Sequence, residues 1–214
     1  SWITACEAVL DQLATMTDMS AITGIGLSGH MHGATLIDAA DRVLRPCMLW
    51  NDTRSADQAA VLDDNADFRR LTGNIVFPGF TAPKVAWIRQ HEPDTFARVA
   101  KILLPKDYLR LWLTGEHVSE MSDAAGTSWL DVGARDWSDD LLAATGLDRD
   151  AMPRLVEGAQ VSGQLRDEWA TRWGLSKGVV VAGGGGDNAD VGLWVGERGR
   201  GSGRHGGCQG TVRE

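Results

Sequence analysis

Short apolar runs alternate with helical segments along most of this chain, and this order constrains the fold more than any other feature of the sequence. Four runs are short and apolar, as buried strands are: residues 22–28, 34–37, 102–104 and 179–182. Five segments have helical periodicity or helix-end signals: Trp2–Met16, 83–91, 106–113 before Gly115, 138–144 and 166–173. Strands and helices mixed in this order predict an α/β domain.

Two of these segments lead to more detailed expectations. Residues 34–37 and 43–44 flank the polar turn 38–42, which predicts a hairpin. Trp2–Met16 has apolar residues at helical spacing and is expected to pack one face against the core.

The composition argues against several classes of function. The net charge of −8 over 214 residues argues against a nucleic-acid partner, which would favour a basic face. No apolar run approaches the roughly 18 residues that a membrane span needs, and no basic-then-apolar leader opens the chain. Cys6, Cys47 and Cys208 are far apart and form no C-x-x-C pair, which predicts free thiols in a reducing compartment. We therefore expect a cytoplasmic protein with no nucleic-acid or membrane partner.

The first candidate site is His30-Met31-His32-Gly33, at the end of the predicted strand 22–28. Loops at strand ends often hold ligand contacts in α/β proteins, because the scaffold fixes their backbone. His32 can exchange a hydrogen bond with a polyol hydroxyl, and Met31 can line the apolar face of a sugar. The alternative is an ordinary histidine pair. A metal site lacks a third ligand at a fitting spacing.

The second candidate site is Trp50-Asn51-Asp52-Thr53-Arg54. An indole, a carboxylate and a guanidinium this close together can form a stacking surface with charge-assisted hydrogen bonds, as sugar sites do. The alternative is that Asp52 caps the helix that follows while Arg54 is solvated.

The third candidate site is the glycine run 183–186 with Asp187 and Asn188, directly after the predicted strand 179–182. Glycines after a strand let the backbone approach a ligand closely. Asp187 would stand at the end of the strand, where its carboxylate can take the proton of a substrate hydroxyl during phosphoryl transfer. No Gly-Lys-Ser/Thr follows, so this is not a Walker P-loop. A tight turn is the alternative that the residues alone leave open.

Taken together and in order, these motifs resemble the xylulose-kinase branch of the FGGY carbohydrate-kinase family. The resemblance covers the chain from Trp2 to Ala189. It rests on the blocks LSGHMHGATLIDAADRVLRPCMLW followed by NDTRS, FPGFTAPK, HEPDTF, LLPKDYLRLWLTG, SDAAGTSWLDV, RDWSDDLL and GGDNA.

The resemblance implies a ribonuclease-H-like N-terminal domain of the actin/hexokinase/Hsp70 ATPase superfamily. The whole enzyme would use ATP and Mg²⁺ to convert D-xylulose to D-xylulose 5-phosphate. Asp187 matches the catalytic base, and Asn188 matches the polar neighbour of that base. Met31 and His32 match the pair that contacts the substrate, and Trp50 matches a sugar-packing tryptophan of the wider family.

The sequence also departs from the family pattern. His30 stands where the family commonly has glutamine, and four glycines precede Asp187 where three are usual. The family's opening β-hairpin with its Asp-x-Gly-Thr loop does not occur in the chain, and neither does the phosphate loop expected after Ala189.

We therefore expect residues 1–189 to form the sugar-binding domain, incomplete at both ends; the ATP loops of the family are absent from this chain, so no cofactor-binding residue is assigned. Residues 190–214 are crowded with glycine and arginine and show no periodicity, so we expect an aberrant, disordered tail in place of the ATP-binding domain. The chain alone is expected to be inactive. The alternatives are a non-catalytic remnant that binds sugar weakly and a fragment of a kinase for a related ketose or polyol.

Overall fold

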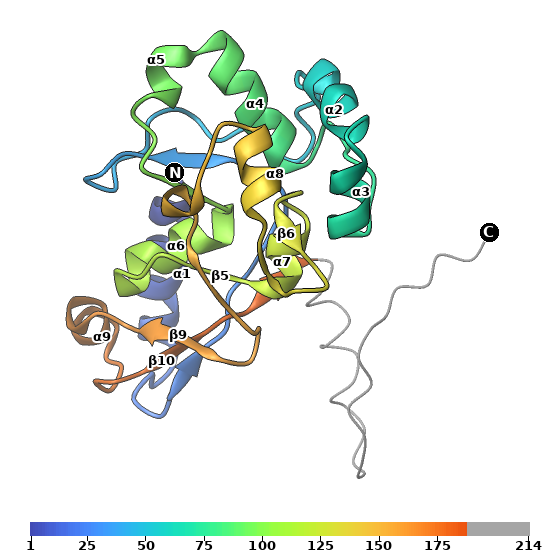
Figure 1. Cartoon of the computed structure of the whole chain (residues 1–214). Coiled ribbons are helices and arrows are strands. Elements are labelled where there is room, and N and C mark those ends of the chain that lie inside the picture. Colours follow the sequence, from blue (N-terminus) through green and yellow to red (C-terminus); the bar gives the residue numbers. More distant parts are fainter. Residues whose placement is uncertain (188–214) are drawn as a thin grey trace.

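Two segments far apart in the sequence run side by side through the fold (Figure 1). The computed structural model describes residues 1–187. β1 (Gly24–Ile25) pairs in parallel with β10 (Val180–Ala182), and β10 pairs antiparallel with β9 (Val161–Gln164). Further along the same two segments, β2 (Ser28–Gly29) pairs in parallel with β11 (Gly185–Gly186). The first and third candidate segments are therefore neighbours.

A shift of one residue separates these two parallel ladders. Gly24 is the register partner of Val180, whereas Ser28 is the register partner of Gly185. The extra residue is taken up around Gly184, whose φ of +73° lies in the left-handed region. A side chain at Gly184 would also clash with the carbonyl oxygen of Leu27, so this position requires glycine.

The prediction of a fully buried strand over residues 22–28 is wrong. Gly24, Gly26 and Ser28 are exposed, whereas Ile25 and Leu27 are partly buried and pack against an apolar cluster. Successive residues of a strand point to opposite faces. The glycines and the serine therefore form an outer face, and only the two larger apolar side chains face inward.

The remaining strands form short pairs. β3 (Thr35–Ile37) pairs antiparallel with β4 (Lys101–Leu103), and β5 (Val118–Glu120) pairs in parallel with β8 (Arg154–Val156). β6 (Leu130–Asp131) and β7 (Asp136–Trp137) form a hairpin. The hairpin expected across residues 38–42 is present as antiparallel bridges between Ile37 and Val43 and between Ala34 and Met48, with a backbone bond from Leu44 to Leu36, and β3 pairs with β4 along its other edge.

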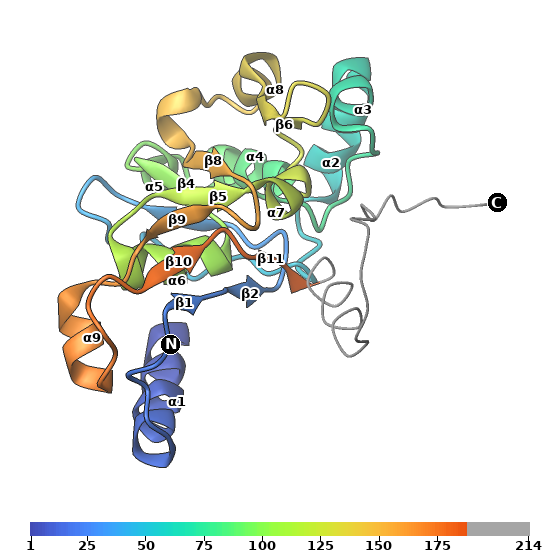
Figure 2. The same ribbon diagram turned by 90° about the horizontal axis from the view of Figure 1, so that it is seen from below.

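All five predicted helices are present: α1 (Trp2–Met16), α4 (Thr81–His91), α6 (Pro105–Thr114), α8 (Asp139–Ala144) and α9 (Asp167–Trp173). The sequence did not single out the other helical elements of the described region: α2 (Ala56–Asp63), α3 (Ala66–Thr72), α5 (Pro93–Phe96), α7 (Met121–Ala125) and the 3-10 turn η1 (Arg149–Ala151). Figure 2 shows α2, α3 and α8 at one end of the molecule and α1 and α9 at the other.

Two main apolar clusters hold these elements together. The larger includes Phe68, Trp129 and Leu141, and the smaller includes Leu113 and Trp173. Within residues 1–187, no helix is long and apolar enough to span a membrane.

Helix α1 packs less closely than the sequence predicts. None of its residues is buried, although Leu10 and Ala14 lie partly buried against the smaller cluster. Val9 and Met16 are 56% and 70% exposed. The expected inward face is therefore only partly covered.

Candidate functional site

The pairing of β2 with β11 brings two candidate segments together. Gly29 and Gly186 are register partners, and the residues that follow them are His30 and Asp187. A Cβ atom on Gly186 would lie only 2.6 Å from Cγ of Met31. The absence of a side chain at Gly186 therefore lets Met31 pack against the strand that carries Asp187.

His32 is held in a specific orientation by three contacts. Its φ of +67° is a left-handed conformation, which is uncommon for a residue with a side chain. Its carbonyl oxygen accepts hydrogen bonds from Nζ of Lys84 at 2.9 Å and from Oγ1 of Thr81 at 3.3 Å. Its Nδ1 lies 2.8 Å from the carbonyl oxygen of Gly126. These contacts fix both the backbone and the ring.

The bond to Gly126 also fixes the tautomer of the neutral imidazole. A carbonyl oxygen only accepts hydrogen bonds, so Nδ1 of His32 carries the hydrogen and Nε2 is left as an acceptor. Burial lowers the pKa of His32; Lys84 and His30 act in the same direction, against the bond to Gly126 and the charge of Asp187. The neutral ring with an acceptor at Nε2 is therefore the form present near pH 7.

Two further residues shape the space around this ring, and sequence reasoning gave neither of them a role. A Cβ atom on Gly126 would lie 2.5 Å from Cε1 of His32, so the ring packs directly on the Gly126 backbone. The ring of Phe80 lies on His32 with 4.7 Å between centroids, and Phe77 contacts Phe80 edge-on at 5.4 Å. Both Gly126 and Phe80 lie in sequence blocks that carry the family resemblance.

Lys84 is fully buried. Burial lowers the pKa of its ammonium to about 8, and nearby Cys47 and Asp52 oppose this change. The hydrogen bond to the His32 carbonyl is therefore made by a cation with little access to water, and charge-assisted bonds of this kind are strong.

The second candidate segment lies beside Phe80, the aromatic residue that contacts the His32 ring. A Cβ atom on Gly79 would lie 2.6 Å from the carbonyl oxygen of Trp50, and Gly79 directly precedes Phe80. The Trp50 residue is 57% exposed. Trp50 therefore offers an open indole surface one residue away from the Phe80 contact.

Asp52 and Arg54 pair with each other instead of following the helix-capping alternative. Arg54 contacts the two carboxylate oxygens of Asp52 at 2.9 and 2.8 Å, and its guanidinium lies 5.1 Å from the centre of the Trp87 ring. Helix α2 begins after Ser55, without a side-chain cap. The carboxylate–guanidinium pair and the nearby indole are thus present.

A buried cluster of charged side chains lies beneath the site. It consists of Lys106, Asp107, Arg110, Glu120 and Asp123, each at most 1% exposed. The ammonium of Lys106 lies 2.8 Å from Asp107, 3.4 Å from Asp123 and 3.7 Å from Glu120. Burial raises the pKa of Asp123 to about 8; Lys106 opposes this shift, and the neighbouring carboxylates add to it.

This buried ionic cluster supports both strands of the site. A Cβ atom on Gly29 would lie 3.0 Å from Cβ of Lys106, so β2 rests directly on α6. The guanidinium of Arg110 donates a hydrogen bond to the carbonyl oxygen of Gly183, just before β11. The cluster therefore fixes the segments that lead to His30 and Asp187.

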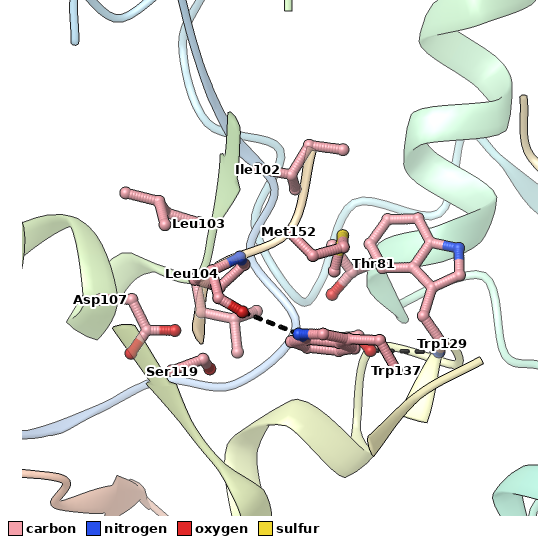
Figure 3. A pocket seen from close by; sticks show the side chains of 11 residues that line it. Thr81, Ile102, Leu103, Leu104, Asp107, Ser119, Trp129, Trp137 and Met152 are labelled. Carbon is pink, nitrogen blue, oxygen red and sulfur yellow. Dashed lines mark hydrogen bonds between the residues drawn. The ribbon is translucent and has the colours of Figure 1, made fainter. Parts of the chain in front are cut away.

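A cavity in the core, lined in part by Thr81 and Asp107, is too small to be the site. Figure 3 shows Asp107 and Ser119 on one side of it and Trp129 and Trp137 on the other. Its volume of about 10 Å³ has room for a single water molecule and not for a sugar.

The described residues bring together Met31, His32 and Asp187, with Trp50 nearby. Asn188 and the expected tail 190–214 lie outside the described residues. No group of three or more His, Cys, Asp or Glu side chains within residues 1–187 could hold a metal ion.

A family model, curated sequences and solved structures all relate this chain to carbohydrate kinases. Residues 1–192 match the N-terminal domain of the FGGY family of carbohydrate kinases. A xylulose kinase from Klebsiella pneumoniae is 52% identical over 91% of this chain and 40% of its own length. The crystal structure of a xyloylose (xylulose) kinase from Brucella ovis is 64% identical, with a TM-score of 0.86 over 88% of this chain and 39% of that one. A xylulose kinase from Rhodospirillum rubrum is 31% identical, with a TM-score of 0.77 over 81% of this chain and 36% of that one.

The fold is that of the sugar kinases in the actin/hexokinase/Hsp70 ATPase superfamily. The chain spans about 40% of the length of the curated relatives that it matches.

Proposed function

Because this chain belongs to the FGGY family of carbohydrate kinases, we propose that it carries the sugar-binding site of a kinase for D-xylulose. The whole kinase would transfer the γ-phosphoryl group of ATP to this sugar and release D-xylulose 5-phosphate and ADP. Relatives at 50–52% identity are xylulose kinases, which supports this sugar over other polyols.

The observation that carries the proposal is the meeting of His32 and Asp187 at the ends of paired strands. Phosphoryl transfer to an alcohol needs a positioned hydroxyl and a group that accepts its proton. In this proposal, the carboxylate of Asp187 takes the proton of the sugar hydroxyl as its oxygen forms the new bond to phosphorus. The bond between the γ-phosphorus and the bridging oxygen breaks, and its electron pair leaves with ADP.

The other site residues would position the sugar. Nε2 of His32 is an acceptor and would receive a hydrogen bond from a sugar hydroxyl. Met31 would contact the apolar C–H face of the sugar, and the exposed indole of Trp50 would stack against it. Asn188 would assist Asp187 from the next position in the chain.

ATP and Mg²⁺ complete the proposal for the whole kinase. Mg²⁺ neutralises the charge that develops on the phosphate oxygens when it is bound. We assign the metal to no residue of 1–187, because the described residues contain no suitable group of ligands.

We propose residues 1–189 as the sugar-binding domain. Phosphoryl transfer would also need the part of the relatives' length that this chain does not span, so we expect binding without turnover from this chain.

Sugar binding to the 214-residue chain tests this proposal. D-xylulose should shift the NMR resonances of the His32 ring in a saturable way, and glycerol should do so far more weakly. His32→Leu should weaken binding at least about fivefold, because a net hydrogen bond contributes about 1 kcal/mol. Equal responses to both ligands, or unchanged affinity in His32→Leu, would contradict the proposal.

A further inference from the structure

His30 is a cross-strand neighbour of Asp187. Gly29 and Gly186 are the last register partners of the parallel pair, so His30 and Asp187 leave the ladder at the same end, close enough for the charge of Asp187 to act on His30. The pair consists of a half-buried histidine and an exposed aspartate. No role has been given to His30 in the proposed reaction.

The imidazole of His30 contains a buried polar atom without a partner. Nε2 of His30 is buried and makes no hydrogen bond to the residues that the structure describes. The ring contacts Trp2 of α1 edge-on, with 5.6 Å between centroids. A buried polar atom without a partner costs stability, and such an atom beside a functional carboxylate indicates a partner that it meets during function.

The charged groups around His30 come from three elements. Burial lowers the pKa of His30; the charge of Asp187, beside β11, opposes this effect, and Lys84 of α4 adds to it. His32, from the same loop as His30, also interacts electrostatically with it. His30 is therefore neutral near pH 7 and becomes protonated only at a pH below the ordinary pKa of histidine.

We propose that His30 is a positioning residue for Asp187: in the sugar complex its Nε2–H, which has no partner among the described residues of this structure, is donated to the Asp187 carboxylate, and protonation of the imidazole weakens that carboxylate as a base. This inference rests on the proposed role of Asp187 as the proton acceptor. In the neutral state, this bond, formed when the sugar is bound, orients the carboxylate toward the sugar hydroxyl and leaves its negative charge available. In the protonated state, the imidazolium and carboxylate form an ion pair, and the carboxylate holds a proton less readily.

The two charges must influence each other equally. If ionised Asp187 favours the protonated form of His30, then protonated His30 favours ionised Asp187 by the same free energy. Removing the charge of Asp187 should therefore make His30 protonate at a lower pH. This relation can be measured without substrate or turnover.

NMR titration of the histidine rings in the full 214-residue chain is the direct test. Asp187→Asn should move the His30 titration midpoint to lower pH, and His30→Gln assigns the His30 resonance by its loss. His117 pairs with Asp41 at 2.7 Å, outside this site, and its curve should coincide in the two proteins. An unchanged His30 curve in Asp187→Asn would overturn the pair. Because the titration needs no sugar, it can fail or succeed independently of the proposed function.

Two substitutions separate orientation from protonation in a kinase extended to the relatives' length. His30→Leu removes the donor and should lower kcat by about tenfold, because hydrogen bonds to charged groups are strong. His30→Gln keeps a donor and cannot be protonated, so the acid limb of its kcat/KM profile should move to lower pH. A purely structural role would leave that limb in place in His30→Gln, and this result would also overturn the proposal.

Discussion

Lys106 holds together the charges beneath the site, and its replacement by methionine should destabilise the protein strongly. Its ammonium is the cation closest to three buried carboxyl groups, at 2.8, 3.4 and 3.7 Å. Methionine keeps much of the side-chain volume, so the change removes a charge without opening a large cavity. The other cation of the cluster, Arg110, contacts Asp107 only at 3.4 Å.

The magnitude follows from the burial of the pair. At an effective dielectric constant of about 20, two charges 2.8 Å apart attract by roughly 6 kcal/mol, but desolvation offsets much of this gain. Removing one partner of a buried pair typically costs about 3–5 kcal/mol. Since whole domains are stable by only about 5–15 kcal/mol, Lys106→Met should lose a large fraction of the free energy of unfolding.

Urea denaturation measures this loss. With an m-value of about 2 kcal/mol/M, the midpoint should fall by roughly 2 M urea. Lys177→Met is the matched control, because Lys177 forms an ion pair of similar length, 2.7 Å, with side chains that are 76% and 66% exposed. Exposed pairs contribute less than about 1 kcal/mol. If Lys106→Met unfolded at the same urea concentration as Lys177→Met, the buried ionic cluster would not stabilise the fold.

Three further predictions concern pH and the orientation of His32. The stability of Lys84→Met should fall relative to that of the wild type as the pH rises from 8 to 10. Over this range Lys84 deprotonates in the folded wild type, which then no longer bears the cost of a buried charge. Urea midpoints of both proteins at the two pH values measure this difference. Asp123→Asn should gain stability relative to the wild type as the pH rises from 5 to 8. The raised pKa of Asp123 makes the stability of the wild type fall as the pH rises through this range, and equal pH dependence in both proteins would contradict this. Gly126→Ala should weaken D-xylulose binding at least about fivefold by displacing the His32 ring, whereas Gly26→Ala, which meets no atom within 4 Å, should bind normally in the same titration.

Most helices were predictable because their signals are local. Gly115 ends α6 with a φ of +84°, and the side chain of Ser138 caps α8 by accepting a bond from the Leu141 amide. Short helices such as α2 and α3 have too few residues to show a clear helical periodicity. Their boundaries depend on packing, of α2 against α4 and of α3 against α2 and β6, which no local pattern indicates.

Strand burial was harder to predict than strand position. Residues 22–28 form strand segments, but the alternation of glycine with larger apolar residues gives them one open face. The shift of one residue between the two ladders depends on Gly184 and cannot be found without the pairing.

The site was predictable as a set of motifs but not as an arrangement. Two candidate loops were predicted after two separate strands, and the structure pairs these strands. The contacts that orient His32 come from Lys84 and Gly126, 52 and 94 residues further along the chain. The buried ionic cluster was missed because charged residues in a helix ordinarily indicate an exposed surface.

The central claim is that Asp187 serves as the proton acceptor for phosphorylation of D-xylulose. The most direct measurement is ATP consumption with D-xylulose and magnesium, by this chain and by a form extended to the length of its relatives. We expect turnover by the extended form only, and loss of that turnover in Asp187→Asn. Full activity in Asp187→Asn, or an extended form that phosphorylates another polyol but not D-xylulose, would contradict it.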